Sequence, residues 1–382
     1  MKAKIVMKNQ KTVVVGMSGG VDSSVSALLM KEQGYNVIGL FMKNWEEKDE
    51  NGVCSSAQDY DDVRRVCDHI DIPYYAVNFV ENYRKQVFTQ FIADFQKGWT
   101  PNPDILCNRE IKFKVFLEKA LELGADFLAT GHYCQNLILD KGSPALVKGI
   151  DHNKDQTYFL YTLNQQILQQ VLFPVGGLEK SQVRDIARKH RLVTAEKKDS
   201  TGICFIGERD FRSFLSQYVA IQPGVFQTLQ GKNVGKHMGT AYYTLGQRKG
   251  LGIGGAGEAW FVVGKDHERG IVFVEQGANH PALYCDELIA TDLSWVAEAP
   301  LLPYTCQSKV RYRQNDQFCT IQRIENGKAF VTFDRPQRAV TPGQSIVFYV
   351  GNICLGGGVI QQPGPTYYDQ EKSLPHQSPR DD

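Results

Sequence analysis

The sequence predicts an α/β protein in which an N-terminal parallel sheet is followed by one or two small β domains. Three observations support this fold class. Between residues 12 and 130, short apolar runs alternate with stretches whose apolar residues recur at helical spacing. Beyond Pro223, glycine-rich and strand-prone segments replace that pattern. A chain of 382 residues is also too long for a single hydrophobic core and should form two or three domains.

The expected strands of the sheet are four short apolar runs: Thr12–Gly16, Val37–Met42, Tyr74–Phe79 and Phe127–Thr130. A helix is expected after the first run, because Val21, Val25 and Leu28 recur at helical spacing. The same periodicity predicts a helix from Glu110 to Leu123 and another after Leu178. Strands and helices in alternation are typical of a parallel sheet whose faces are covered by helices.

The second half of the chain is expected to be mainly β. Segments such as AWFVVGKD, GIVFVEQG, AFVTFD and SIVFYVG combine β-branched and aromatic residues and are separated by turn formers. The last stretch, QQPGPTYYDQEKSLPHQSPRDD, has no apolar periodicity. We therefore expect a disordered tail at the C-terminus.

The composition excludes several classes of protein. No apolar run approaches the roughly 20 residues that span a bilayer, and the first residues lack the features of a signal peptide, which predicts a cytoplasmic protein without membrane contact. The nine cysteines contain no C-x-x-C pair, which argues against a zinc ribbon or a cysteine-ligated iron–sulfur cluster. No dedicated metal site is therefore expected. The net charge of +1 neither supports nor excludes binding to nucleic acid.

The most informative motif lies between the first strand and the first helix. It consists of Gly16, Met17, Ser18, Gly19, Gly20, Val21, Asp22, Ser23 and Ser24. Its glycines let backbone N–H groups converge, its serine hydroxyls add donors, and the helix N-terminus favours an anion. A phosphate or pyrophosphate is the expected occupant, and a capped glycine turn is the structural alternative. The motif lacks the lysine of the G-x-x-x-x-G-K-S/T loop.

Two cysteines are expected to be reactive. Cys107, in NPDILCNREIKF, is expected in a loop directly before a helix and close to Arg109, a setting that favours the thiolate. Cys204, in DSTGICFIG, follows Lys197 and Lys198 and precedes another expected helix, so it shares these features. A small buried side chain is the alternative for each, and packing is the expected role of the other seven, including Cys67 on a helical stripe.

The loop resembles the SGGxDS signature of the PP-loop ATP pyrophosphatases, which cleave ATP between the α and β phosphates and activate an oxygen as its adenylate. Further strings extend the likeness: NPDILCNREIKF, DSTGICFIG, GLFMKNW, ATGHY, KDQTYFLY, YTLGQRKGLGIGG and VRYRQ. From residue 12 to about residue 360 the chain resembles the tRNA-specific 2-thiouridylases, the MnmA family within that superfamily.

The resemblance implies a fold and an activity. It implies a PP-loop (adenine nucleotide α hydrolase-like) domain over 1–220, a central β-rich domain over 221–285, a C-terminal β-barrel domain over 286–362 and a tail over 363–382. ATP would adenylate the C2 oxygen of a wobble uridine, and sulfur would then replace that oxygen, giving 2-thiouridine, AMP and pyrophosphate. It also implies the Lys, Glu and Gln tRNAs as substrates and a cysteine desulfurase or sulfur-relay protein as donor. Triphosphate chemistry implies Mg²⁺ with the ATP.

The resemblance also assigns site residues. The implied ATP contacts are Gly16, Met17, Ser18, Gly19, Gly20, Val21, Asp22, Ser23, Met42 and Gly131, with Asp22 also a candidate contact for Mg²⁺. The implied tRNA contacts are Asn102, Pro103 and Asp104 at the target base, together with His132, Lys154, Asp155, Gln156, Arg311, Tyr312 and Gln344. Cys204 would carry sulfane sulfur as a persulfide, and Cys107 would be its partner thiol. Either the persulfide or released sulfide could attack the base.

Several alternatives remain open from the residues alone. Arg311, Tyr312 and Arg313 suit phosphates and a stacked base, yet a solvated strand face would look the same. His132 could equally be a strand-end histidine satisfied by hydrogen bonds. Another PP-loop enzyme acting on a small molecule, such as an amide-forming synthetase, would explain the loop but not the paired cysteines. A non-catalytic RNA-binding module would explain only the β domains.

Overall fold

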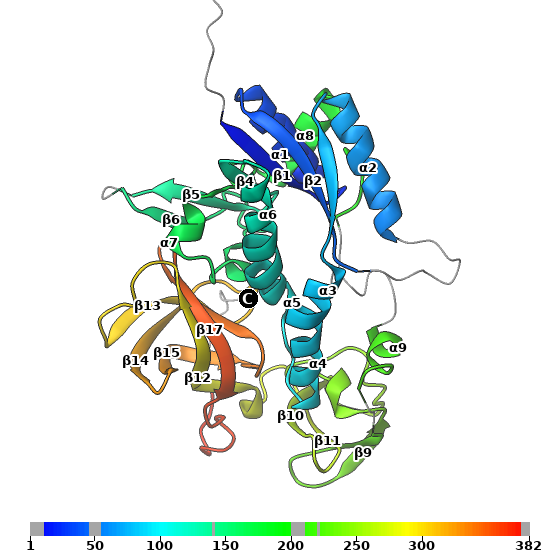
Figure 1. Ribbon diagram of the computed structural model, residues 1–382. Helices are drawn as coiled ribbons and strands as arrows, with labels where there is room; N and C mark the ends of the chain where they lie inside the picture. The colour runs from blue at the N-terminus through cyan, green and yellow to red at the C-terminus, as the bar shows by residue number, and fades with distance from the viewer. Residues whose placement is uncertain (1–10, 46–54, 140–141, 200–210, 220–221, 376–382) are drawn as a thin grey trace, which may run out of the picture. The chain divides into compact units, whose positions relative to one another are not determined.

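A computed structural model describes residues 11–45, 55–139, 142–199, 211–219 and 222–375 (Figure 1). The described residues form two compact units. The first unit contains the described parts of Met1–Val87, Asp104–Gly207 and Asn352–Cys354. The second unit contains the described parts of Phe88–Pro103, Glu208–Gly351 and Leu355–Asp382. Cys204, the expected sulfur carrier, lies outside the described residues.

The first unit is built on a parallel sheet with the strand order β3-β2-β1-β4-β7. Its strands are β1 (Thr12–Met17), β2 (Asn36–Lys43), β3 (Tyr74–Asn78), β4 (Phe127–Ala129) and β7 (Val171–Leu172). The chain runs outward from β1 to β3 and then returns to the other side of β1 for β4. Such a reversal leaves a crevice at the carboxyl ends of the central strands, where open α/β sheets bind ligands. The predicted parallel sheet is confirmed.

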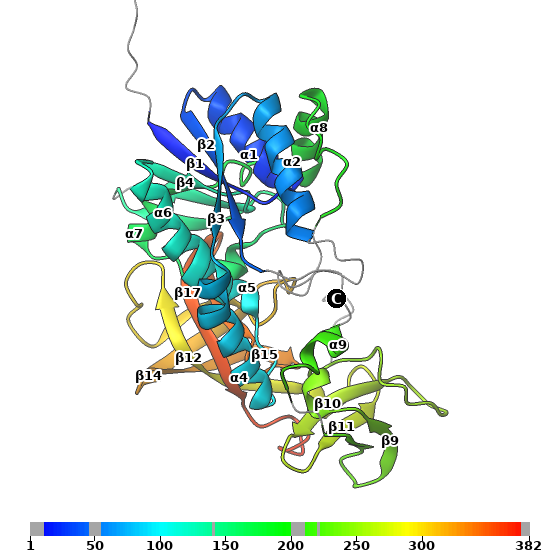
Figure 2. The same cartoon turned by 45° about the vertical axis from the view of Figure 1, so that its right-hand side comes forward.

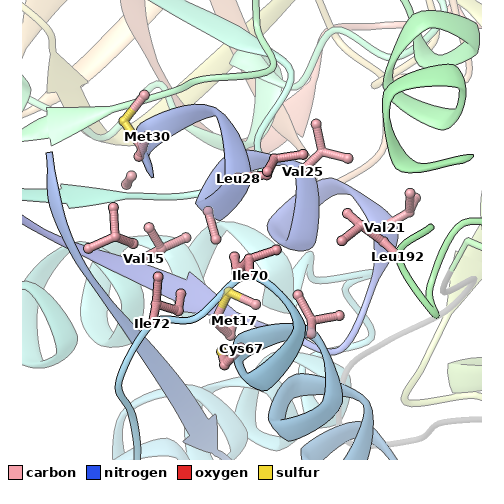
Figure 3. Close-up of a cluster of buried hydrophobic side chains, with 14 of the residues drawn as sticks. Val15, Met17, Val21, Val25, Leu28, Met30, Cys67, Ile70, Ile72 and Leu192 are labelled. Atoms are coloured by element: carbon pink, nitrogen blue, oxygen red, sulfur yellow. The ribbon is translucent and has the colours of Figure 1, made fainter. Parts of the chain in front are cut away.

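Three helices share one hydrophobic core with strand β1. They are α1 (Val21–Glu32), α2 (Ser55–His69) and α8 (Lys180–Lys189), and they lie close together in Figure 2. Figure 3 shows part of this core, where Met17 of β1 and Cys67 of α2 lie side by side. Burial raises the pKa of the Cys67 thiol to about 12, so the thiol stays protonated and acts as a small apolar side chain, as its position on the helical stripe predicted.

Several shorter elements lie between β3 and α8. They are α3 (Val80–Tyr83), the π-helices η1 (Arg84–Phe88) and η2 (Cys107–Val115), α4 (Thr89–Gln96), α5 (Pro103–Leu106), α6 (Phe116–Glu122), β5 (Cys134–Ile138), β6 (Pro144–Lys148), η3 (Thr157–Phe159) and α7 (Gln165–Leu168). Helical structure runs from α5 through η2 to α6, with a kink at Phe113, where the backbone leaves the helical region. The expectation of a helix starting near Glu110 is therefore wrong. The helical segment begins at Pro103, because proline is compatible with the first turn of a helix.

The second unit contains a mixed four-stranded sheet in the order β10-β11-β8-β9. Its elements are α9 (Phe211–Leu215), β8 (Gly224–Gln227), β9 (Asn233–His237), η4 (Thr240–Tyr242), β10 (Trp260–Asp266) and β11 (Ile271–Gln276). Helix α4 also belongs to this unit, although the sequence suggested that residues 1–220 form one domain. Just before α4, Phe88 packs against Phe214 and Tyr218, with ring centroids 6.0 and 4.8 Å apart. Aromatic contacts therefore join α4 to the segment around α9.

The second unit also contains a closed barrel. Its elements are η5 (Pro281–Leu283), β12 (Tyr284–Trp295), β13 (Tyr304–Lys309), β14 (Gln317–Glu325), β15 (Lys328–Arg338), β16 (Ser345–Val350) and β17 (Ile353–Pro363). The sheet runs in the order β12-β15-β14-β13-β16-β17, and β12 pairs again with β17. This second pairing closes the barrel around an apolar interior that includes Ile321, Val331 and Phe348. The predicted C-terminal β-barrel is confirmed.

The described part of the C-terminal segment is ordered. Tyr367 and Leu374 pack on a cluster that includes Phe261 and Tyr284, and the Tyr367 N–H donates to the Tyr284 carbonyl at 2.9 Å. The expectation of disorder therefore does not hold for residues 363–375, because two isolated apolar side chains can anchor a segment that lacks periodicity. The domain boundaries expected from the sequence stay predictions. None of the described helices has the length and apolar character needed to cross a membrane.

A substitution in a central strand tests the core of the first unit. Leu40 of β2 is 0% exposed, so Leu40→Ala should lower the free energy of unfolding by about 2–5 kcal/mol through lost burial and a new cavity. Leu301 is 92% exposed, so Leu301→Ala is the matched control and should change stability by less than about 0.5 kcal/mol. Denaturant unfolding followed by circular dichroism measures both, and equal losses would contradict this assignment of the core.

Candidate functional site

The glycine- and serine-rich loop joins β1 to α1 at the point where the strand order reverses. The hydroxyls of Ser23 and Ser24 donate to the Gly20 carbonyl at 3.1 and 2.8 Å, and the Ser18 N–H donates to Ser23 Oγ at 3.2 Å. Gly19 has φ of +76°, and a Cβ there would lie 2.7 Å from the backbone oxygen of Asp59. The loop is therefore tight and held by its own hydrogen bonds, and it leads into the N-terminus of α1, whose first N–H groups could donate to an anion.

Gly131 approaches the same turn from the neighbouring strand. It follows β4, and a Cβ at this position would lie 2.9 Å from the backbone of Asp22 and Ser23. Met42, half-buried, lies near the carboxyl end of β2, which pairs with β1. The structure thus brings the expected ATP contacts together at the carboxyl edge of three adjacent strands.

Asp22 in this loop is already paired. The Lys180 ammonium donates to both carboxylate oxygens, at 2.7 and 2.8 Å, and the Tyr133 hydroxyl donates to Oδ1 at 2.7 Å. Lys180 Nζ also lies 5.6 Å from the centroid of the Tyr133 ring. Burial and the adjacent Asp22 charge raise the pKa of Tyr133, so its hydroxyl stays protonated and remains a donor.

Asp199, beside Asp22, forms ion pairs with three cationic side chains. Its carboxylate accepts hydrogen bonds from Lys154 at 2.7 Å, from Lys180 at 2.8 Å and from Arg184 at 3.1 Å. Burial by itself would raise the pKa of Asp199, but the bonds from Lys154 and Lys180 outweigh it and lower that pKa to about 2. Asp199 is therefore ionised at neutral pH. We refer to Asp22, Lys154, Lys180, Arg184 and Asp199 as the charged cluster.

The segment Lys154–Gln156, expected to contact tRNA, makes intramolecular bonds. Lys154 pairs with Asp199, as described above. Asp155 is buried, and its Oδ1 accepts the N–H groups of Gly149 and Thr157, each at 3.2 Å. Gln156 accepts the Tyr133 N–H at 2.9 Å through its side-chain oxygen. These bonds hold the chain that carries Tyr133, and contact with tRNA stays a prediction for the three residues.

Cys107 opens the π-helix η2 and is 2% exposed. The sequence suggested a thiol in a loop before a helix, whereas the structure has it buried within a helical segment that begins at Pro103. Asp104 lies in the preceding turn, and burial raises the pKa of its carboxyl while Lys112 opposes that effect. Because Cys204 lies outside the described residues, the pairing of the two thiols stays a prediction.

His132 is a buried residue of the first unit. Its Nδ1 lies 2.8 Å from the Thr130 hydroxyl, and its ring is 5.7 Å from that of Phe113 and 6.3 Å from that of Phe173. Burial holds the pKa of His132 well below its usual value, so the imidazole is neutral at pH 7. This geometry matches the alternative of a hydrogen-bonded histidine at a strand end, and a contact with tRNA stays a prediction.

The remaining expected tRNA contacts are Asn102, Pro103, Asp104, Arg311, Tyr312 and Gln344. All of them except Asp104 belong to the second unit. Arg311 donates to the carbonyls of Leu245 and Ala339 at 3.0 and 2.8 Å, and Tyr312 is half-buried. Gln344 donates to the Thr100 carbonyl at 2.7 Å, and the Thr100 N–H donates to Pro342.

Gly343 beside Gln344 has φ of +87°, and a Cβ there would meet Thr100 and Trp99 at 3.0 Å. Gln344 therefore holds the chain just before Asn102 and Pro103, whose own roles stay predictions.

Three residues of the charged cluster had no predicted role: Lys180, Arg184 and Asp199. Tyr133, which is bonded to Asp22, had none either. Lys180 begins α8, in a stretch whose apolar periodicity signalled only a helix. Tyr133 and Asp199 lie inside the strings ATGHY and DSTGICFIG, which carried the resemblance without a role for these positions. The missing lysine of the loop was the available signal, because an anion site without its own cation needs one from elsewhere in the chain.

Gly131 offers a test of the close approach to α1. Gly131→Ala should force the first turn of α1 to move, lower the free energy of unfolding by about 1–3 kcal/mol, and weaken binding of inorganic pyrophosphate. Gly177→Ala is the control, because nothing lies within 4 Å of a Cβ at that position. Denaturant unfolding and calorimetric titration measure the two effects. Equal pyrophosphate affinity in both variants would show that this contact does not shape the anion site.

Comparison with known proteins gives three family matches along the chain. Residues 11–208 match the tRNA methyl transferase HUP domain, residues 212–276 match the tRNA methyl transferase PRC-barrel domain, and residues 285–360 match the aminomethyltransferase beta-barrel domain. The first match covers the parallel-sheet region with the loop, and the third covers most of the closed barrel.

Individual relatives carry a different description from the family models. The chain is 98% identical over 376 residues to the tRNA-specific 2-thiouridylase MnmA of Protochlamydia amoebophila (strain UWE25), covering 98% of this chain and 100% of that protein. It is 58% identical over 352 residues to the protein of the same name from Bacillus subtilis (strain 168), covering 91% and 94%.

Among solved structures, the U34-tRNA thiolase NcsA from Methanococcus maripaludis matches 56% of this chain and 67% of its own, at 20% identity and a TM-score of 0.33. That likeness is too weak to carry an argument.

The identities to the two curated relatives extend over nearly the whole chain, and from them it follows that the chain belongs to the MnmA family of tRNA-specific 2-thiouridylases.

Proposed function

We propose that this chain converts the wobble uridine of tRNA to 2-thiouridine in an ATP-dependent reaction. The observation that carries the proposal is 98% identity over the whole length of a relative named as a tRNA-specific 2-thiouridylase. The glycine- and serine-rich loop at the carboxyl edge of the sheet supports it independently, since the reaction needs a nucleoside triphosphate and open α/β sheets bind ligands at this edge. The proposed substrates are the Lys, Glu and Gln tRNAs, with a cysteine desulfurase or sulfur-relay protein as donor.

The first step of the proposed reaction is adenylation. The C2 oxygen of the uracil attacks the α-phosphorus of ATP, the bond to the β-phosphate breaks, and pyrophosphate leaves. The loop from Gly16 to Ser23 would hold the phosphates through N–H groups and hydroxyls, with Met42 and Gly131 beside the nucleotide. Asn102, Pro103 and Asp104 would bind the base, where a carboxyl oxygen of Asp104 can accept the uracil N3–H. The adenylated oxygen then becomes a good leaving group.

The second step transfers sulfur. The terminal sulfur of a Cys204 persulfide attacks C2, and AMP departs with the former C2 oxygen. The Cys107 thiolate then attacks the Cys204 sulfur, which breaks the sulfur–sulfur bond to the base and forms a Cys107–Cys204 disulfide. The sulfane sulfur is thereby reduced and the two thiols are oxidised, so an external reductant must restore them. In the alternative order, Cys107 releases hydrosulfide first, and hydrosulfide attacks C2.

Mg²⁺ is part of the proposal as a companion of ATP. The described residues contain no group of three or more His, Cys, Asp or Glu side chains that could hold a metal ion, and Asp22 is bonded to Lys180 and Tyr133. These observations fit an ion held mainly by phosphate oxygens and water, with Asp22 as at most one ligand. When bound, Mg²⁺ would reduce the negative charge of the phosphates.

The matching family models are named after methyl transfer, whereas the relatives are named after thiolation. Analysis of the modified nucleoside decides which of the two reactions this chain catalyses. Unmodified tRNA incubated with protein, ATP and a persulfide donor should yield 2-thiouridine at the wobble position, with AMP and pyrophosphate formed in equal amounts. Mass spectrometry of the digested tRNA distinguishes sulfur-for-oxygen exchange from an added methyl group. A methylated nucleoside, AMP formation that does not depend on tRNA, or tRNA binding without ATP turnover would contradict the proposal.

The two cysteines have separable expected effects. Cys204→Ser should bind ATP normally but accept no sulfane sulfur, because a hydroxyl cannot carry it. Cys107→Ser should accept sulfur on Cys204 yet release no thiolated tRNA, and only the wild type should form a Cys107–Cys204 disulfide after one turnover without reductant.

Cys67→Ala is the matched control for both variants, since this buried thiol packs in the core and should be dispensable for turnover. Sulfur labelling and peptide mapping measure these outcomes. Normal labelling of Cys204→Ser would assign the carrier role to another cysteine.

A further inference from the structure

Asp22 presents an electrostatic problem within the anion-binding loop. Its carboxylate belongs to the first turn of α1, the same turn whose N–H groups face an incoming anion. A phosphate chain bound there would be close to this negative charge. Two negative charges this close together repel each other strongly when the site is partly shielded from solvent. The loop can bind a polyphosphate well only if the Asp22 charge is compensated.

Lys180 is in position to compensate it. Its ammonium bonds to both oxygens of Asp22, at 2.7 and 2.8 Å, so the pair has the geometry of a close ion pair. The Lys180 side chain is 12% exposed and that of Asp22 is 31% exposed, which limits screening by solvent. Tyr133 adds a third hydrogen bond to the same carboxylate. The charge of Asp22 is therefore balanced by Lys180 before any ligand arrives.

Other residues keep Lys180 where it is. Its backbone N–H, at the start of α8, donates to Asp151 Oδ2 at 3.1 Å, and the preceding Glu179 N–H donates to Gln182 Oε1 at 2.8 Å. Asp199 binds the ammonium from the other side at 2.8 Å. Helix α8 and Asp199 thus hold the cation against α1, although Lys180 and Asp22 are far apart in the sequence.

We propose that Lys180 is a positioning residue that makes the loop able to bind ATP by neutralising Asp22. It acts through Asp22 and not by contact with the phosphates, in contrast to the lysine of a G-x-x-x-x-G-K-S/T loop, which reaches the phosphates directly. The inference rests on the proposed function in taking ATP as the occupant. It adds a residue and a physical role that the loop sequence does not contain.

A double-mutant cycle tests this role by calorimetric titration with ATP, without tRNA and with divalent metal chelated, so that metal contacts do not contribute. Lys180→Met should weaken ATP binding about tenfold or more, because it leaves the Asp22 charge uncompensated. Lys180→Met combined with Asp22→Asn should bind ATP within about threefold of Asp22→Asn alone, because no charge then needs compensation. Lys180→Arg should keep most of the affinity, since it retains the cation.

Arg188→Met is the matched control, because Arg188 lies on the same helix and pairs with Asp185 and Glu196 but has no bond to the loop. It should bind ATP like the wild type. The thermal unfolding midpoint of each variant separates loss of binding from loss of fold. Lys180→Gln, which also removes the cation, carries the test alone and in the Asp22→Asn background if Lys180→Met does not fold.

Two results would overturn the inference. ATP affinity unchanged in Lys180→Met would show that Asp22 needs no partner. Affinity that stays as weak in the double variant as in Lys180→Met would show that Lys180 contacts the phosphates directly. Failure of the wild-type protein to bind ATP at all would instead contradict the proposed function, so the two failures can be told apart.

Discussion

In the proposed function, the first turn of α1 offers N–H groups to an anion while it carries the carboxylate of Asp22, and these two demands conflict. A carboxylate near a helix N-terminus is stabilised by the helix dipole when the site is empty. The same carboxylate opposes any phosphate that enters. The surrounding structure is organised around this conflict, since the hydrogen bonds to Asp22 come from two other parts of the first unit.

The parallel sheet makes that arrangement possible. Strand β4 lies next to β1, so the residues that follow β4, Gly131 and Tyr133, reach the first turn of α1. Helix α8 shares a core with α1 and brings Lys180 to the same turn. Asp155 and Gln156 then fix the chain around Tyr133 by bonds to backbone N–H groups. A site formed from separate segments is thus held by packing and by hydrogen bonds to the backbone.

The sequence predicted the parts of this fold that depend on local patterns. Strands such as β1 and β2 are buried on both faces and form short apolar runs, so they could be located within a residue or two. The loop was recognisable because its glycines and serines lie within nine residues of sequence.

The start of the helical segment at Pro103 was missed, since an Asn-Pro pair is also typical of a turn. Lys180 could not be assigned, because a bond between residues far apart in the chain leaves no periodic signal. The ordered C-terminal residues depend on two apolar anchors, Tyr367 and Leu374, which composition alone does not reveal.

The position of α4 in the sequence affects the folding of the chain during its synthesis. It lies between two segments of the first unit in the sequence, yet its buried side chains, Phe91 and Phe95, belong to the second unit. During synthesis α4 therefore emerges well before Phe214, which packs against Phe88, and before Pro342, whose carbonyl accepts the Thr100 N–H. The apolar side chains of α4 therefore stay exposed until the ribosome has made these later segments. Exposed aromatic surface during this period favours chaperone binding or aggregation.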